Sequence, residues 1–259
     1  MKLIWSRDNP FFKGLKRLAE SGRERRKAGR SLLDGVHLVE AYEAVHGPVE
    51  TLVVAESALV GGEIARFVEG RTIVALADAL LRDLGLVDTP SGLLAVVATP
   101  TATVAVDREK DAILLDGVQD PGNVGAILRS AAAAGIGQAL LAPGCATAWS
   151  PKVLRAGQGA HFVLAIHEDA DLAAFMADYR GTTAVTCLDD ATPLYDASWD
   201  GPLAWVFGAE GQGVRGELLA AARLRVRIPM PGAVESLNVA AAAAVCLFEA
   251  LRRKLASSA

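Results

Sequence analysis

Three segments of the sequence place glycines and polar side chains where an apolar run ends. They are Leu114–Ser130 (LLDGVQDPGNVGAILRS), Val206–Val214 (VFGAEGQGV) and Ile228–Val239 (IPMPGAVESLNV). In an open parallel sheet, ligands bind beyond the carboxyl ends of the strands. We therefore expect these three segments to contribute to a ligand-binding site.

Two charged side chains in these segments need either a partner or solvent. Arg129 lies about a turn and a half into a predicted helix that continues through alanines, where an unpaired guanidinium would be costly to bury. Glu210 lies between glycines at the end of an apolar strand and is under the same constraint. Taken singly, the nearby polar residues have structural explanations, because Asn123 and Ser236 could each cap a helix. Only the combination of these side chains indicates chemistry.

The glycines at positions 208, 211 and 213 resemble a dinucleotide-binding loop only superficially. Their order is G-x-x-G-x-G near the C-terminus, whereas the dinucleotide fingerprint is G-x-G-x-x-G between a strand and a helix. Such glycines still allow a ligand to approach the backbone closely. The order of the glycines therefore disfavours a nucleotide-dependent oxidoreductase and leaves other ligands open.

The elements that position these segments alternate between strands and helices. Buried strand candidates cover residues 112–115, 138–142, 161–166, 182–188 and 203–208. Helix candidates separate them, which predicts a mainly parallel sheet covered on both faces. We therefore predict an α/β fold.

The chain before residue 112 predicts a smaller α/β domain behind a basic lead. Residues 1–30 carry ten Lys and Arg against three Asp and Glu, a balance of +7, so the remainder of the chain sums to −11 within the total of −4. Such a segment is either a solvated helix face or an anchor for a phosphate backbone. We place the small domain at residues 31–100, a linker at 101–111 and the second domain at 112–259.

The composition argues against several other classes of protein. No apolar run reaches the roughly 18 residues of a membrane-spanning helix, and the N-terminus carries charges where a signal peptide would be apolar, so we expect a cytoplasmic protein. Cys145, Cys187 and Cys246 are too few and too widely spaced for a disulfide framework or a zinc site, and we expect buried, reduced thiols. The four histidines lack metal-ligand spacing, so we expect no metal.

Together, the three segments resemble the three motifs of the SpoU (TrmH-type) RNA ribose 2'-O-methyltransferases, a family of the SPOUT superfamily. The matching patterns are N-x-G-x-x-x-R at Asn123–Arg129, F-G-x-E-G-x-G at Phe207–Gly213, and I-P-M-P-G with S-L-N-V at Ile228–Val239. The earlier segments NPFFKGLKRL and LDGVHLVEA are similar to the substrate-binding domain of the family. The resemblance implies a C-terminal α/β domain with a trefoil knot, a smaller RNA-binding domain, S-adenosylmethionine as the methyl donor, and a homodimer.

The resemblance also implies roles for particular residues. The positions that match cofactor-binding residues are Gly208, Ile228, Met230 and Leu237. Arg129 matches the catalytic arginine, and because a guanidinium stays protonated we assign it first to stabilising the developing alkoxide and a neighbouring phosphate. The residues expected to orient Arg129 and the ribose are Asn123, Glu210, Ser236 and Asn238, with Glu210 anchoring the guanidinium. The proton acceptor stays open.

Cations outside the motifs are candidates for phosphate contacts. Lys152 and Arg155 lie in a segment that resembles a family sequence ending R-A-S-x-G, with Gly157 in place of the usual serine. In the basic lead the candidates are Arg23, Arg25 and Arg26. The basic lead favours ribosomal RNA over tRNA as the substrate. A tRNA methyltransferase and a non-catalytic RNA-binding protein with the same fold remain alternatives.

Overall fold

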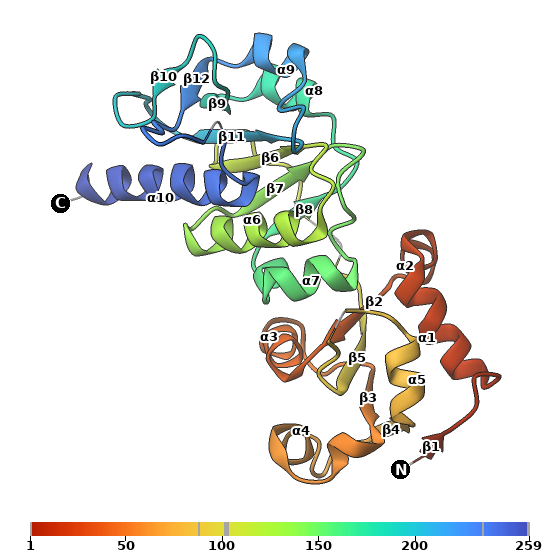
Figure 1. Cartoon of the computed structure of the whole chain (residues 1–259). Coiled ribbons are helices and arrows are strands. Elements are labelled where there is room, and N and C mark those ends of the chain that lie inside the picture. The colour runs from red at the N-terminus through yellow and green to blue at the C-terminus, as the bar shows by residue number, and fades with distance from the viewer. Residues whose placement is uncertain (1, 88, 101–103, 235, 258–259) are drawn as a thin grey trace. The chain divides into compact units, whose positions relative to one another are not determined.

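The computed structural model divides into two compact units (Figure 1). It describes residues 2–87, 89–100, 104–234 and 236–257. Unit 1 comprises residues 1–100 and 149–162, and unit 2 comprises residues 101–148 and 163–259. The sequence predicts a linker at residues 101–111, and residues 101–103 of it lie outside the described residues.

Unit 1 contains a mixed five-stranded sheet in the order β1-β4-β3-β5-β2. Its strands are β1 (Lys2–Ile4), β2 (Arg30–Asp34), β3 (Thr51–Ala55), β4 (Ile73–Leu76) and β5 (Leu93–Ala98). Its helices are α1 (Pro10–Glu20), α2 (Gly22–Ala28), α3 (Val36–His46), η1 (Glu56–Leu59), α4 (Gly62–Phe67), α5 (Asp78–Asp83), α7 (Pro151–Gly157) and η2 (Ala160–Phe162). β5 is antiparallel to β3 and β2, whereas β1, β4 and β3 are parallel.

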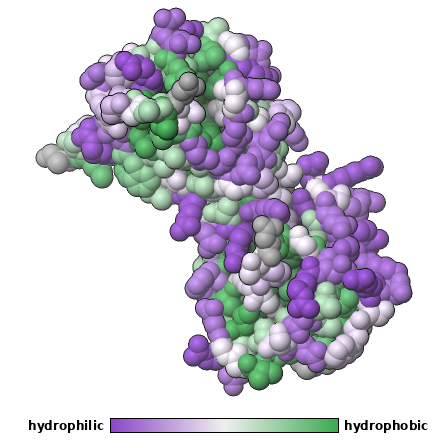
Figure 2. All heavy atoms as spheres, in the orientation of Figure 1, coloured by the Kyte–Doolittle hydropathy of each residue, from purple (hydrophilic) through white to green (hydrophobic). Residues whose placement is uncertain are grey.

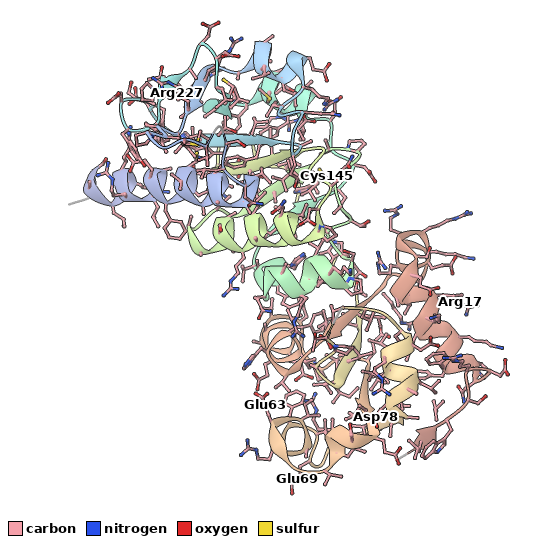
Figure 3. The ribbon with its side chains drawn as sticks, viewed as in Figure 1. Arg17, Glu63, Glu69, Asp78, Cys145 and Arg227 are labelled. Atoms are coloured by element: carbon pink, nitrogen blue, oxygen red, sulfur yellow. The ribbon has the colours of Figure 1, made fainter. Side chains whose placement is uncertain are left out.

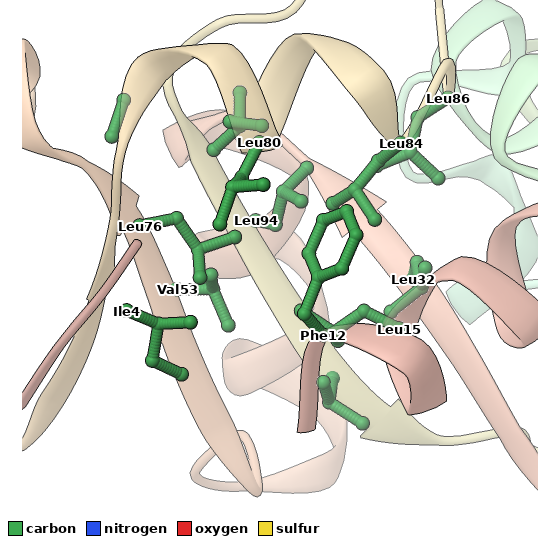
Figure 4. Close-up of a cluster of buried hydrophobic side chains, with 13 residues drawn as sticks. Ile4, Phe12, Leu15, Leu32, Val53, Leu76, Leu80, Leu84, Leu86 and Leu94 are labelled. Atoms are coloured by element: carbon green, nitrogen blue, oxygen red, sulfur yellow. The ribbon is translucent and has the colours of Figure 1, made fainter. Parts of the chain in front are cut away.

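Alternating apolar residues give the sheet of unit 1 a core on each face. Val53 and Leu94 point into one cluster, which Phe12 of α1 completes (Figure 4). The adjacent Val54 and Leu93 belong to the cluster on the other face, beneath α3. Because successive side chains of a strand point to opposite faces, a continuous apolar strand of this kind must be covered on both sides.

The segment of residues 149–162 packs with unit 1, although it lies between two strands of unit 2 in the sequence. Leu154 and Phe162 join the cluster that contains Val39 and Tyr42. The ring of Phe162 meets Tyr42 edge-on, with 5.4 Å between the ring centroids. Burial of these apolar side chains fixes the segment in unit 1.

Unit 2 contains a seven-stranded sheet in the order β10-β12-β9-β11-β6-β7-β8, in which every described strand pairing is parallel. Its strands are β6 (Ala112–Asp116), β7 (Gln138–Leu141), β8 (Ala165–His167), β9 (Thr182–Thr186), β10 (Thr192–Pro193), β11 (Leu203–Gly208) and β12 (Leu224–Arg227). Its helices are α6 (Pro121–Ala133), α8 (Leu172–Asp178), α9 (Gly216–Ala221) and α10 (Val239–Ser257). The α/β fold predicted from the sequence is confirmed, while the trefoil knot stays a prediction.

The two central strands of unit 2 are buried along their whole length. On one face, Leu114 of β6 and Val206 of β11 pack with residues of α8 and α9. The side chains of Trp205 and Phe207 alternate with these and stack on each other, with 6.0 Å between their ring centroids. α10 packs along α6 and contacts β11. None of the helices in the described part of the chain is both long and apolar enough to cross a bilayer.

Candidate active site

The strand order of unit 2 reverses between β6 and β11. From β6 the chain continues to β7 and β8 on one side, and then to β9 on the other, with β11 inserted between β9 and β6. β6 and β11 end together, because Asp116 is the register partner of Gly208. Ligands bind beyond the carboxyl ends of strands at such a reversal. This edge of the sheet is therefore the candidate active site.

A tight loop follows β11 and carries Glu210. Ala209 and Gly213 exchange two backbone hydrogen bonds of 3.1 and 2.9 Å, which close the loop on itself. A Cβ atom at position 208 would lie 2.1 Å from the backbone carbon of Gly213, so only glycine fits at Gly208. The loop therefore turns directly at the end of the strand and leaves Glu210 exposed.

The helix after β6 brings Asn123 to this loop. Pro121 begins α6, and Asp120 caps the helix because its side chain accepts from the backbone nitrogen of Asn123 at 2.8 Å. Asn123 is thus not the helix cap that its sequence position allows. Its Nδ2 instead donates to Glu210 Oε1 at 2.6 Å, which connects the first and second motifs.

The start of α10 adds the third motif to the same network. Asn238 Oδ1 accepts from two backbone nitrogens of the first turn at 2.9 and 3.2 Å, so Asn238 is the cap of α10 and Ser236 is not. Asn238 Nδ2 also donates to Asn123 Oδ1 at 2.9 Å. Asn238, Asn123 and Glu210 therefore form one continuous chain of side-chain hydrogen bonds across three motifs.

Arg129 lies on α6 and is exposed. Within the residues that the structure describes, its guanidinium forms no hydrogen bond or ion pair. The sequence predicts that Glu210 anchors this guanidinium, but the Glu210 carboxylate pairs with Asn123 instead. Six residues of α-helix correspond to about 600° of rotation, so the side chains of Asn123 and Arg129 leave α6 on different faces. Arg129 is left available to an external anion.

Of the residues matched to the cofactor, Gly208 is the last residue of β11, and the other three lie in the segment between β12 and α10. Gly208 is buried, Ile228 and Met230 are half-buried, and Leu237 is 40% exposed. Ser236 is exposed at the end of the same segment. Three apolar side chains at this edge thus keep surface that the protein itself does not cover.

An ion pair between the buried Asp116 and the exposed Arg215 lies at this edge, and neither residue is predicted from the sequence as part of the site. Asp116, the last residue of β6, is 4% exposed. Its Oδ1 accepts from Arg215 Nε at 2.7 Å, and its Oδ2 accepts from the Arg215 backbone nitrogen at 2.8 Å. The signal in the sequence is a carboxylate at the end of an apolar strand, because a buried carboxylate requires a cation or several donors.

Cys145 lies in the loop after β7, at the same edge (Figure 3). Its Sγ donates to the carbonyl oxygen of Leu115 at 3.2 Å, and burial raises the pKa of the thiol. The thiol therefore stays protonated at neutral pH and is a poor nucleophile. The sequence predicts three buried thiols, but only Cys246 is buried, while Cys145 and Cys187 are half-buried.

The three arginines proposed for RNA binding in the basic lead differ in their surroundings. Arg23 and Arg26 are exposed on α2, and neither pairs with another residue in the described part of the chain. Arg25 is 6% exposed, and its Nη1 donates to the carbonyl oxygens of Leu18 and Ala19 at 2.7 and 3.1 Å. Because Arg25 satisfies the C-terminal carbonyls of α1, its assignment to phosphate binding is wrong.

The two cations proposed on α7 also differ. Lys152 is exposed. Arg155 is half-buried and its Nη1 pairs with the buried carboxylate of Asp34, so it has a structural partner in unit 1. Gly157, which replaces the usual serine, is buried. Arg155 is thus a weaker candidate for a phosphate contact than the sequence implies.

The sequence matches two family models. Residues 111–248 match the SpoU rRNA Methylase family. Residues 9–95 match the MRM3-like substrate binding domain. The first match spans the three motifs and most of unit 2, and the second lies in unit 1. The resemblance identified from the motifs is confirmed.

Individual relatives agree with these matches over nearly the whole chain. The Bacillus subtilis 23S rRNA (guanosine(2553)-2'-O)-methyltransferase RlmP is 31% identical over 251 residues, covering 96% of this chain and 98% of the relative. A crystal structure of an RNA 2'-O ribose methyltransferase is 31% identical with a TM-score of 0.84, covering 98% and 99% of the two chains. The methyltransferase AviRb from Streptomyces viridochromogenes, solved with AdoMet, is 26% identical with a TM-score of 0.82, covering 95% and 98%. The chain therefore belongs to the SpoU rRNA methylase family.

Proposed function

We propose that this protein transfers the methyl group of S-adenosylmethionine to a ribose 2'-hydroxyl of ribosomal RNA. The observation that carries the proposal is the hydrogen-bonded chain of Asn238, Asn123 and Glu210, which unites three motifs at the carboxyl edge of the sheet. The relative from Bacillus subtilis is named for this reaction on 23S rRNA. Site geometry and family membership thus support the same chemistry.

The residues at the carboxyl edge fit a bound S-adenosylmethionine. Glycine at position 208 lets the Gly213 backbone pack directly against the end of β11, so the Glu210 loop closes tightly at this edge. Ile228, Met230 and Leu237 keep exposed apolar surface, which suits the faces of an adenine ring. When bound, the cofactor supplies a methyl group activated by its sulfonium charge.

The side chains of this chain serve the other reactant, the ribose. A hydroxyl is a weak nucleophile until its proton leaves. Arg129 stabilises the developing alkoxide and a neighbouring phosphate, and it acts as a cation because a guanidinium stays protonated. The chain of Asn238, Asn123 and Glu210 holds the polar edge in one geometry, and the exposed Ser236 hydroxyl helps to orient the ribose.

The RNA surface that we propose on unit 1 is cationic. Hydrophilic residues gather over α1 and α2 (Figure 2), and Arg17 extends from α1 (Figure 3). Arg23, Arg26 and Lys152 add exposed positive charge. Contacts between such side chains and phosphates hold an RNA without reading its sequence. The selection of one nucleotide then depends on how the folded RNA presents it to the site.

A second copy of the chain completes the proposed assembly. α10 exposes Phe248 at 46% and Leu255 at 63%. Seven residues are close to two turns, so both side chains lie on one face of the helix. A helix buries such an apolar stripe against another element. We therefore propose a cytoplasmic homodimer through α10, with the trefoil knot in the chain that precedes this helix. A monomer in light scattering would contradict the dimer.

Ribose methylation tests the proposed function directly. Purified protein with isotopically labelled S-adenosylmethionine should methylate a ribose of ribosomal RNA. The same ribose should lack its methyl group in total RNA from cells without the gene. Methylation of a tRNA instead would change the substrate class. Failure to bind S-adenosylmethionine in calorimetry would favour a non-catalytic RNA-binding protein.

A further inference from the structure

An ion pair between the exposed Arg215 and the buried Asp116 connects the end of the Glu210 loop to the centre of the sheet. Asp116 is 4% exposed, and both of its carboxylate oxygens accept hydrogen bonds from Arg215. One of these bonds comes from the side chain and the other from the backbone. These two bonds therefore fix both the backbone at residue 215 and the direction of its guanidinium relative to β6.

The loop from β11 to Arg215 is closed by the two Ala209–Gly213 hydrogen bonds but contains flexible residues. Gly211 and Gly213 have φ angles of 83° and 69°, a region that glycine enters without steric cost. Glycine also leaves more backbone freedom to be lost on ordering than any other residue. Glu210 lies between the end of β11 and these two glycines. A contact at the far end of the loop adds to the two Ala209–Gly213 hydrogen bonds in limiting the positions that Glu210 adopts.

We infer that Asp116 and Arg215 are positioning residues for methyl transfer, because they hold the loop where Glu210 accepts the Asn123 hydrogen bond. The inference rests on the proposed function. Asp116 ends β6 and Asn123 lies in the helix that follows, so the loop is attached to one neighbouring segment at two points. The ion pair acts through Glu210 and is not assigned any contact with the ribose or the methyl donor.

Substitution of Arg215 should separate turnover from binding. Arg215→Met should lower kcat by about 10- to 100-fold, because a small displacement of a positioning group costs this much. The KM for RNA and the Kd for S-adenosylmethionine should stay within about threefold of the wild type, since we assign the ion pair no contact with either ligand. Both variants keep the backbone hydrogen bond to Asp116. Arg215→Lys also keeps the positive charge, so it should recover part of the lost turnover.

Glu217 provides a matched control. Its Oε1 lies 3.1 Å from Arg215 Nη1, and both side chains are more than half exposed. Glu217→Gln removes this exposed partner and leaves the pair with Asp116 intact, so kcat should be unchanged. A loss of turnover in Glu217→Gln equal to that in Arg215→Met would show that the surface charge, and not the contact with Asp116, matters.

A double-mutant cycle with Glu210 distinguishes positioning from a general structural role. If Arg215 acts through Glu210, Arg215→Met should have little further effect on kcat in a Glu210→Gln background. Additive losses would overturn the inference. If Arg215→Met fails to fold, the same cycle with Arg215→Lys gives the same decision. An inactive wild type would refute the proposed function and the inference together, whereas an active wild type with fully active Arg215 variants refutes the inference alone.

Discussion

Two arginines of unit 2 have opposite surroundings. Arg129 lies on α6, the helix that starts at the carboxyl edge of the sheet, and it is exposed without a partner among the described residues. At the amino edge, Arg253 of α10 donates to Glu249 Oε1 at 2.6 Å and to two carbonyl oxygens of the segment after β10 at 2.9 Å each. Its guanidinium also lies 4.6 Å from the ring centroid of Trp199. The guanidinium of Arg129 is available to a ligand, whereas that of Arg253 is bound by groups of the protein itself.

The amino edge nevertheless holds a cavity of about 1010 Å³, lined by residues that precede β6, β7 and β11 and by the C-terminal half of α10. A functional site chosen by cavity size alone would thus lie outside the three motifs. The unused hydrogen-bonding capacity of a charged side chain is the better guide here, because an unpaired guanidinium retains its full affinity for an anion. The following predictions test this division between a catalytic and a structural edge.

The largest effect on turnover should come from Arg129→Ala. We expect kcat to fall by at least about 100-fold, because the variant removes the cation that stabilises the developing alkoxide. The Kd for S-adenosylmethionine should be unchanged in calorimetry. The free energy of unfolding should change by less than about 0.5 kcal/mol, because the side chain is exposed. An active variant would remove Arg129 from the site.

The largest effect on stability should come from Glu249→Gln at the other edge. Hydrogen bonds from Arg252 and Arg253 hold the pKa of Glu249 at about 2, below its ordinary value of 4.5, although the side chain is only 8% exposed. A depressed pKa means that the ionised form stabilises the folded state. The variant should therefore lose about 3 kcal/mol in free energy of unfolding at pH 7.

The pH dependence of this loss provides its own control. The stabilisation by Glu249 is fully present above about pH 4.5 and disappears as the pH falls towards 2, so wild type and variant should converge over that range. Urea unfolding at a series of pH values measures this. Methyl transfer per folded molecule should be unaffected, and a clear loss of activity would break the division between the edges.

A smaller effect on turnover should follow from cutting the hydrogen-bond chain. Asn123→Ala removes both of its side-chain links, and we expect kcat to fall by about 10- to 30-fold through loss of positioning. Asn238→Asp is the sharper variant, because aspartate still caps α10 but cannot donate to Asn123. It should lower kcat without lowering the melting temperature. Full activity in both variants would show that the chain is only structural.

The smallest effect should come from the cationic surface of unit 1. Replacing both Arg23 and Arg26 by Gln should weaken RNA binding about three- to tenfold. The slope of log K against log salt should decrease in magnitude by about 0.7 to 0.9 for each lost phosphate contact. Arg25→Gln is the matched control, because this buried arginine binds carbonyl groups of α1. It should lower stability and leave the salt slope unchanged.

The sequence was sufficient for the α/β class and for the family, because apolar runs and ordered motifs are local signals. It did not determine which of several adjacent polar residues takes which role. Asp120 and Asn123 are both possible helix caps, and the signal that decides is Pro121, which favours the first helical position directly after Asp120.

The burial of Arg25 in the basic lead could not be predicted from the sequence either. Arg23, Arg25 and Arg26 look alike in a dense run of charges, and only the turn at Ser21 between α1 and α2 directs Arg25 to the carbonyls that end α1. The exposure of Arg129 and its lack of an anchor on Glu210 depend on helix rotation and on contacts between motifs far apart in the chain. Such contacts leave no periodic pattern.

The packing of residues 149–162 with unit 1 affects how this protein can be divided experimentally. The chain passes between the two units three times, after residues 100, 148 and 162. A fragment that starts at residue 101 would carry Leu154 and Phe162 without the apolar cluster that buries them. A fragment that ends at residue 100 would leave the Asp34 carboxylate without its arginine. A single cut therefore damages both pieces, and each unit keeps its packing only in the uncut chain.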